Sequence, residues 1–118
     1  MSRVLVCGGR NYYNQSRVDQ VLDAAVERLS LAVVIQGAAR GADEAAIDWA
    51  IRRGVEFTSF HADWETMGKR AGWARNQRML DEGKPDVIIA FPGGRGTADM
   101  VKRAESAGVR VIRIDWNA

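Results

Sequence analysis

The chain has 118 residues, 47% of them hydrophobic and 27% charged, which fits one compact domain whose core needs no metal or disulfide. Its one cysteine, Cys7, excludes an internal disulfide. Neither a signal-peptide pattern nor a membrane-length apolar run is present, so we expect a cytoplasmic protein without membrane contact. The formal net charge of +2 suits an anionic ligand, whereas duplex-DNA binding usually shows a stronger basic stripe.

The first half of the chain alternates strand-like and helix-like segments. An apolar run at 4–7 predicts a strand that ends at a Gly-Gly pair, and a second run at 31–35 predicts another strand. Apolar residues at helical spacing predict an amphipathic helix over 16–30, with Ser16 as its N-cap. A second helix is expected over 41–53, with its alanines on the inner face.

The second half continues this alternation. From residue 55 onward we expect, in chain order, a strand at 55–60, an irregular polar stretch at 61–70, a helix at 71–82, a strand at 87–91, a helix at 97–107 and a strand at 109–114. Strands alternating with helices predict an α/β fold, here a single Rossmann-like domain over 1–118 with a mainly parallel, five-stranded sheet. Ligands of such open sheets bind at the carboxyl ends of the strands.

The most informative segment is a glycine-rich turn between an apolar run and a helical stretch. It consists of Pro92, Gly93, Gly94, Arg95, Gly96 and Thr97. Glycines let the backbone lie close against another group, because no Cβ intervenes. A turn of this kind at a helix N-terminus presents N–H groups and the positive end of the helix dipole to an anion. The turn therefore predicts a phosphate-bearing ligand.

Glycine and arginine also follow the first two predicted strands. The residues concerned are Gly8, Gly9, Arg10 and Tyr12 after the first strand, and Gly37, Arg40, Gly41 and Asp43 after the second. Each arginine offers a planar fork that matches phosphate geometry. Any one of them alone is typical of a solvated loop, but three arginines beside glycines at strand ends favour ligand contact. Neither turn matches a Walker A loop or a clean G-x-G-x-x-G fingerprint.

Several single residues also have a predicted role. Asp43 either caps the second helix or accepts a hydroxyl of a ribose. Trp116 is expected to pack the C-terminal end. His61 is the one histidine, so no metal site or cofactor is expected. Aromatic side chains near the strand ends are candidates to stack on a base, namely Tyr12, Trp64 and Trp73.

Four motifs in this order resemble the YspA-type branch of the SLOG superfamily, a set of small bacterial and phage proteins. They are Gly8 to Tyr12, Gly37 to Asp43, Ala71 to Asn76 with Met79, and Ala90 to Thr97. The wider superfamily includes the LONELY GUY phosphoribohydrolases, once misnamed lysine decarboxylases, DNA-processing protein A, and nucleotide-sensing domains. The resemblance spans nearly the whole chain and implies a Rossmann-like fold with a ligand derived from a nucleotide.

The enzymes of the superfamily use Pro-Gly-Gly-x-Gly-Thr-x-x-Glu together with an upstream arginine. The phosphate-loop portion is intact here, and Arg75 with Met79 resembles the arginine portion. The glutamate position is Met100, while Asp99 stands one residue early, which turns its side chain by about 100° on a helix. The resemblance implies Arg75 and Asp99 as the catalytic pair of an N-glycosidase and leaves open whether the chain is an enzyme.

These observations support three functions. The leading hypothesis is a sensor or sequestering module that binds a nucleotide-like small molecule, with the phosphate on the N–H groups of Gly94 to Thr97 and Asn76 nearby. The first alternative is a nucleoside-monophosphate phosphoribohydrolase. The second is a protein that binds single-stranded nucleic acid, which the modest net charge disfavours. The resemblance to enzymes that dimerise also implies a homodimer.

Overall fold

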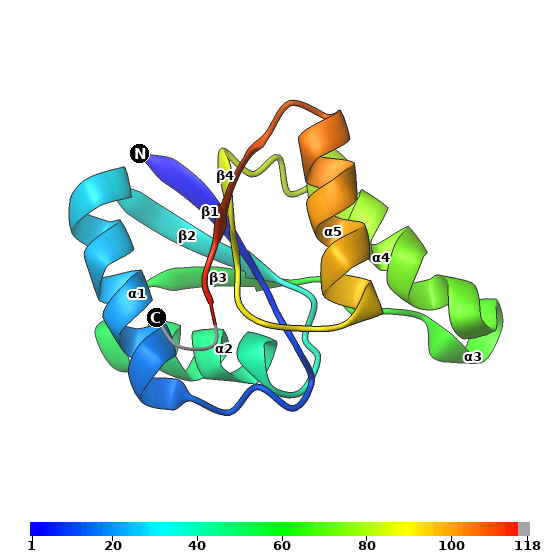
Figure 1. Cartoon of the computed structure of the whole chain (residues 1–118), viewed down its shortest axis with the longest axis horizontal. Helices are drawn as coiled ribbons and strands as arrows, with labels where there is room; N and C mark the ends of the chain where they lie inside the picture. The colour runs from blue at the N-terminus through cyan, green and yellow to red at the C-terminus, as the bar shows by residue number, and fades with distance from the viewer. Residues whose placement is uncertain (116–118) are drawn as a thin grey trace.

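The computed structural model describes residues 1–115, so Trp116 lies outside the described residues. Within them, one sheet of five parallel strands has the order β3-β2-β1-β4-β5 (Figure 1). The strands are β1 (Ser2–Cys7), β2 (Leu31–Gln36), β3 (Glu56–Ser59), β4 (Val87–Ala90) and β5 (Arg110–Arg113). The predicted fold class, an α/β domain with a mainly parallel five-stranded sheet, is confirmed.

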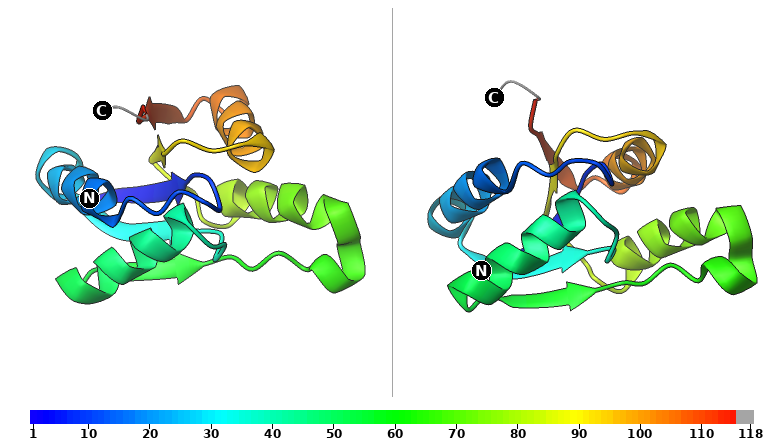
Figure 2. Two further views of the ribbon diagram at one scale, coloured as in Figure 1. Left: turned by 60° about the horizontal axis from the view of Figure 1, so that its bottom comes forward. Right: turned by 90° about the horizontal axis from the view of Figure 1, so that it is seen from below.

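The helices cover both faces of this sheet. They are α1 (Gln15–Leu29), α2 (Ala42–Arg53), α3 (Trp64–Met67), the 3-10 turn η1 (Gly68–Arg70), α4 (Ala71–Asp81) and α5 (Arg95–Ser106). Helices α1 and α2 lie on one face, and α4 and α5 lie on the other (Figure 2). No helix within residues 1–115 is long and apolar enough to cross a bilayer.

Two apolar cores follow from this layering. Alternate residues of a strand point to opposite faces, so Val4 and Val6 of β1 pack with α1 and α2, whereas Leu5 packs with α4 and α5. The central strands are buried on both sides and are accordingly apolar, over residues 4–7 of β1 and throughout β4. Strand β3 lies at an edge of the sheet, and its Phe57 is 38% exposed. Ligands of open parallel sheets bind at the carboxyl ends of the strands, so a site is expected where the buried strands β1 and β4 end.

Three local predictions are wrong. Asn14 rather than Ser16 caps α1, because its side chain accepts a hydrogen bond from the Arg17 N–H at 3.1 Å. The stretch 61–70 is not irregular, since it contains α3 and η1, and Asp63 caps α3 through the Thr66 N–H. Helix α5 begins at Arg95, two residues before the predicted start.

Candidate functional site

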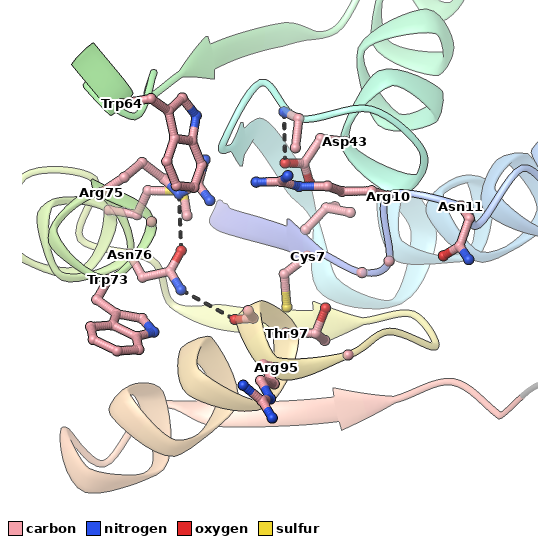
Figure 3. Close-up of a pocket in the computed structure, with 18 of the residues that line it drawn as sticks. Cys7, Arg10, Asn11, Asp43, Trp64, Trp73, Arg75, Asn76, Arg95 and Thr97 are labelled. Carbon is pink, nitrogen blue, oxygen red and sulfur yellow. Dashed lines mark hydrogen bonds between the residues drawn. The ribbon is translucent and has the colours of Figure 1, made fainter. Parts of the chain in front are cut away.

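A cavity of about 400 Å³ lies where β1 and β4 end, and its walls come from α2, α3, α4 and α5 (Figure 3). We call it the main pocket. Its lining brings together many of the predicted ligand-binding residues, namely Gly8, Gly9, Arg10, Asp43, Arg75, Asn76, Gly94, Arg95, Gly96 and Thr97. Residues from four strand-to-helix connections thus converge here, as expected for the carboxyl edge of a parallel sheet.

The α5 side of the pocket presents the backbone of the first turn of the helix. The first hydrogen bond of α5 runs from the Ala98 N–H to the Gly94 carbonyl, so the N–H groups of 95–97 have no partner inside the helix. A Cβ built on Gly94 or on Gly96 would meet no atom within 4 Å, and neither residue has a positive φ. Packing therefore does not require glycine at these two positions, whereas a ligand lying against the backbone would.

The glycines on the β1 side have a different role. A Cβ on Gly8 would come within 2.6 Å of the Ala42 Cβ, and a Cβ on Gly41, which has φ +78°, would come within 2.6 Å of the Arg10 carbonyl carbon. The Gly9 carbonyl accepts the N–H of Ala42 at 3.1 Å, and the Gly9 N–H binds the Pro92 carbonyl at 2.8 Å. These glycines hold the turns after β1, β2 and β4 together.

Arg75 and Asn76 link the two sides of the main pocket. The Arg75 Nη1 donates to the Gly37 carbonyl at 2.6 Å, and its Nε donates to the Asn76 Oδ1 at 3.0 Å. A Cβ on Gly37 would overlap this guanidinium. Asn76 is buried, and its Nδ2 donates to the Gly96 carbonyl at 3.2 Å (Figure 3). Asn76 therefore orients the first turn of α5.

Asp43 contributes the one carboxylate of the main pocket among its described lining residues. The side chain is 6% exposed, and its Oδ2 accepts the Ala39 N–H at 3.1 Å. Burial raises the pKa of Asp43 to about 6, while the Ala39 hydrogen bond and nearby Arg75 act in the opposite direction. The prediction that Asp43 caps the helix is wrong, because Glu44 fills that role by accepting the N–H of Gly41.

The thiol of Cys7 also reaches the main pocket. It is buried, as predicted, and burial together with the nearby Asp43 raises the pKa of Cys7 to about 12. The thiol therefore stays protonated and is a poor nucleophile near neutral pH.

Cationic and aromatic side chains complete the lining. Four cationic side chains line the pocket, namely Arg10, Lys69, Arg75 and Arg95, while Asp43 is the one carboxylate among its described lining residues. This excess of positive charge favours an anionic ligand. Trp64 and Trp73 are 48% and 51% exposed and also line it, as is typical of surfaces on which a base stacks. The Arg10 guanidinium lies over the Trp64 ring, 5.1 Å from its centroid.

Six predicted ligand-binding residues lie outside the lining of the main pocket, among them Gly41, which packs against the backbone of Arg10. Gly37 and Arg40 line a neighbouring hollow, whereas Pro92 and Gly93 face a cleft toward β5. Tyr12 does not stack in the pocket: it is 3% exposed and packs in the core, 5.5 Å from the Phe91 ring. The apolar surroundings supplied by α1 and α2 bury this ring, and its position after Gly-Gly did not indicate that.

Asp99 belongs to another groove. Its carboxylate pairs with Arg103 at 2.8 Å and accepts the Asn76 Nδ2 at 3.0 Å. This groove, between α4 and α5, also contains Lys102. Asn76 thus lies between Arg75 and Asp99, since it forms a hydrogen bond with each of them. Met100, at the position of the glutamate in the enzymes, is buried in the core.

Sequence reasoning missed Gln36. This residue is fully buried, and its side-chain oxygen accepts the Ala38 N–H at 2.6 Å, while its amide donates to the Ser59 hydroxyl. It thereby holds Ala38 at φ +57°. A polar residue that ends an otherwise apolar strand was the available signal.

With this geometry established, comparison with known proteins decides the family. Residues 2–67 match the profile of the YspA, cpYpsA-related SLOG family. The Gene 61 protein of Mycobacterium phage D29 is 40% identical over 120 residues, which cover 95% of this chain and 95% of the phage protein. The chain belongs to the YspA, cpYpsA-related SLOG family. The resemblance noted from the four sequence motifs is confirmed.

Two solved structures share the fold of this SLOG family member. DNA processing protein A (DprA) from Streptococcus pneumoniae superposes with a TM-score of 0.77 at 20% identity, covering 98% of this chain and 50% of that one. The Moco Carrier Protein from Chlamydomonas reinhardtii gives 0.67 at 17% identity, covering 97% and 76%. The chain spans about half the length of the DprA chain, and at these identities the likeness shows the fold alone.

Proposed function

We propose that the protein binds a nucleotide or nucleotide-derived ligand in the main pocket and acts as a sensor or sequestering module. The observation that carries the proposal is the open space over Gly94 and Gly96 at the start of α5. A phosphate there would accept hydrogen bonds from the N–H groups of the first turn, and it would lie at the positive end of the helix dipole. The names of the two fold neighbours, one a cofactor carrier and one a DNA-processing protein, are compatible with such a ligand.

The remaining lining residues give each part of the ligand a partner. Arg95, Thr97 and Arg75 all line the pocket (Figure 3), so in this proposal Arg95 and the Thr97 hydroxyl would lie beside the phosphate and Arg75 would face it from the α4 wall. Trp64 or Trp73 stacks on the base. The second interpretation of Asp43, as an acceptor for a ribose hydroxyl, agrees with its place in the lining.

Titration calorimetry with a panel of nucleoside monophosphates and their parent nucleosides tests this proposal. We expect the monophosphates to bind and the nucleosides to bind at least about tenfold more weakly, because charge-assisted hydrogen bonds contribute about 1.5–3 kcal/mol. Arg95→Ala should reduce the affinity. Arg78→Ala, which removes an exposed arginine of α4 outside the pocket lining, is the matched control. Absence of binding across the panel would refute the proposal.

A second candidate function is hydrolysis of the N-glycosidic bond of a nucleoside monophosphate, favoured by a buried carboxylate in the main pocket. The oxygen of water would add to the ribose C1′ while the bond to the base breaks, and one water proton would pass to the leaving base. Asp43 or, as the resemblance implies, Asp99 would handle that proton. Release of free base would establish the activity, and its loss in Asp43→Asn or in Asp99→Asn would identify the carboxylate responsible. No release from any monophosphate would exclude the activity.

A further inference from the structure

A second hollow adjoins the main pocket beyond Trp64. Its volume is about 330 Å³, and cationic or titratable side chains dominate its lining, namely Arg10, Arg40, His61 and Arg75. No Asp or Glu occurs among the described residues that line it. This second hollow therefore also has a net positive charge that suits an anion, without the carboxylate that the main pocket contains.

The two hollows form one groove. They share Arg10, Trp64 and Arg75, and the stacked pair of Arg10 and Trp64 lies at their boundary. Each also has cations of its own, Arg95 in the main pocket and Arg40 in the second hollow. Positive charge is thus placed on both sides of an exposed aromatic ring rather than at a single point.

The floor of the second hollow is fixed by buried contacts. Ala38 has φ +57°, a conformation that non-glycine residues rarely adopt, and the buried Gln36 holds it there. The Gly37 carbonyl binds the Arg75 guanidinium, and the Ala39 N–H is fixed by Asp43. The hollow is consequently preformed, which lowers the entropic cost of ligand binding.

We infer that the ligand carries two separated anionic groups, one against the start of α5 and one between Arg40 and Arg75, with a base beside Trp64. This inference deepens the proposed function and rests on it. A nucleoside 5′-monophosphate carries one such group, whereas a nucleoside 3′,5′-bisphosphate or a 5′-phosphorylated dinucleotide carries anionic groups at two separated positions. The same chemistry occurs in a single nucleic acid strand, so the source must be separated by experiment.

Calorimetry with adenosine 5′-monophosphate, adenosine 5′-diphosphate, adenosine 3′,5′-bisphosphate and the 5′-phosphorylated dinucleotide pApA tests the inference. We expect the last two to bind about tenfold more tightly than the first two, as one added charge-assisted contact allows. The diphosphate controls for charge, because its phosphates are adjacent. Equal affinity for all four would overturn the inference while leaving the proposed function intact, whereas no binding by any would overturn both.

Arg40→Ala locates the second anionic group. We expect this variant to lose the tenfold gain while its affinity for the monophosphate stays within about twofold of wild type. Arg110→Ala, which removes an exposed arginine on β5 outside both hollows, should retain the gain. An equal loss for mono- and bisphosphate in Arg40→Ala would contradict the inference.

A ten-nucleotide strand separates the two sources. An affinity equal to that of pApA identifies a small dinucleotide-like ligand that occupies the two hollows. A further rise that weakens steeply with salt identifies a strand whose neighbouring phosphates occupy them. An affinity of pApA and of the strand no greater than that of the monophosphate overturns the inference.

Discussion

The turn after β1 and the turn after β4 both contain paired glycines, yet the protein uses them differently. Gly8 has no room for a Cβ because Ala42 packs against it, and Gly41 of the adjoining turn has a positive φ beside the backbone of Arg10. Gly94 and Gly96 have open space in front of them and ordinary φ values. Packing thus requires glycine at Gly8 and Gly41, and also at Gly93 of the second turn, whereas no packing contact requires it at Gly94 and Gly96, where we propose that the ligand lies.

Arg75 and Asn76 connect these regions. One guanidinium binds the Gly37 carbonyl on the β2 side, and the neighbouring amide binds the Gly96 carbonyl on the α5 side. Because packing requires Gly8 and Gly41, substitutions there should act mainly on stability. Substitutions at Gly94 and Gly96, which have open space in front of them, should act mainly on ligand binding.

The largest expected effect is at Gly41. Gly41→Ala should lower the free energy of unfolding by about 3 kcal/mol, because a left-handed conformation costs about 1–2 kcal/mol and steric overlap adds about 1–3 kcal/mol. Urea denaturation measures this loss. Gly54→Ala is the matched control, since Gly54 also has a positive φ but no atom near its Cβ position. Equal losses in the two variants would contradict close packing at Gly41.

Asp43 supplies a pH-dependent test of the first region. Its pKa is raised from 3.8 to about 6, so the folded state binds more protons than the unfolded state between these values. The free energy of unfolding should therefore fall as the pH rises from about 4 to about 6, by up to about 3 kcal/mol. In Asp43→Asn this contribution should vanish, which urea denaturation across that pH range would show. An unchanged pH profile in the variant would contradict the burial of an ionisable Asp43.

Gly96 separates stability from binding most clearly. Gly96→Ala should raise the free energy of unfolding by about 0.5–1 kcal/mol, because alanine favours the helix and no atom obstructs its Cβ. The same methyl group should weaken nucleotide binding about tenfold by filling the space where the phosphate lies. Thermal unfolding and calorimetry on one preparation measure both effects. A Gly96→Ala variant that is less stable than wild type and binds the nucleotide with unchanged affinity would contradict the role proposed for Gly96.

Asp99 should have the smallest effect. Asp99→Asn removes a partly exposed ion pair with Arg103, which contributes about 0–1 kcal/mol. Because Asp99 lines the groove between α4 and α5 rather than the main pocket, nucleotide affinity should stay within about twofold in calorimetry. A tenfold loss of affinity would place Asp99 in the binding site.

Much of this structure could be predicted from local sequence patterns. Buried strands such as β1 and β4 are continuous apolar runs, and the glycines after them indicate the carboxyl edge where the pocket lies. Helix α3 was missed because four residues are too few to show helical periodicity, and the start of α5 was missed because Gly96 is a poor helix former. The burial of Tyr12 depends on tertiary packing that no local pattern reports.

The placement of the two carboxylates shows the same limit. The spacing of Asp99 indicated a side chain turned away from the expected glutamate position, and Arg103, four residues later on α5, is its local partner, but its hydrogen bond with Asn76 depends on how α5 packs on α4. For Asp43 the sequence leaves two roles open. Its burial depends on the turn of Ala39, and that turn depends on Gln36.

Amide chemical shifts of ¹⁵N-labelled protein, recorded while adenosine 5′-monophosphate is added, test the central claim most directly. If the phosphate lies on the first turn of α5, the N–H signals of Arg95, Gly96 and Thr97 should move most, with smaller changes around Arg75. Gly41 should move little, because packing requires glycine at that position and it does not line the main pocket. Shifts confined to other parts of the chain, or none at the start of α5, would contradict the account.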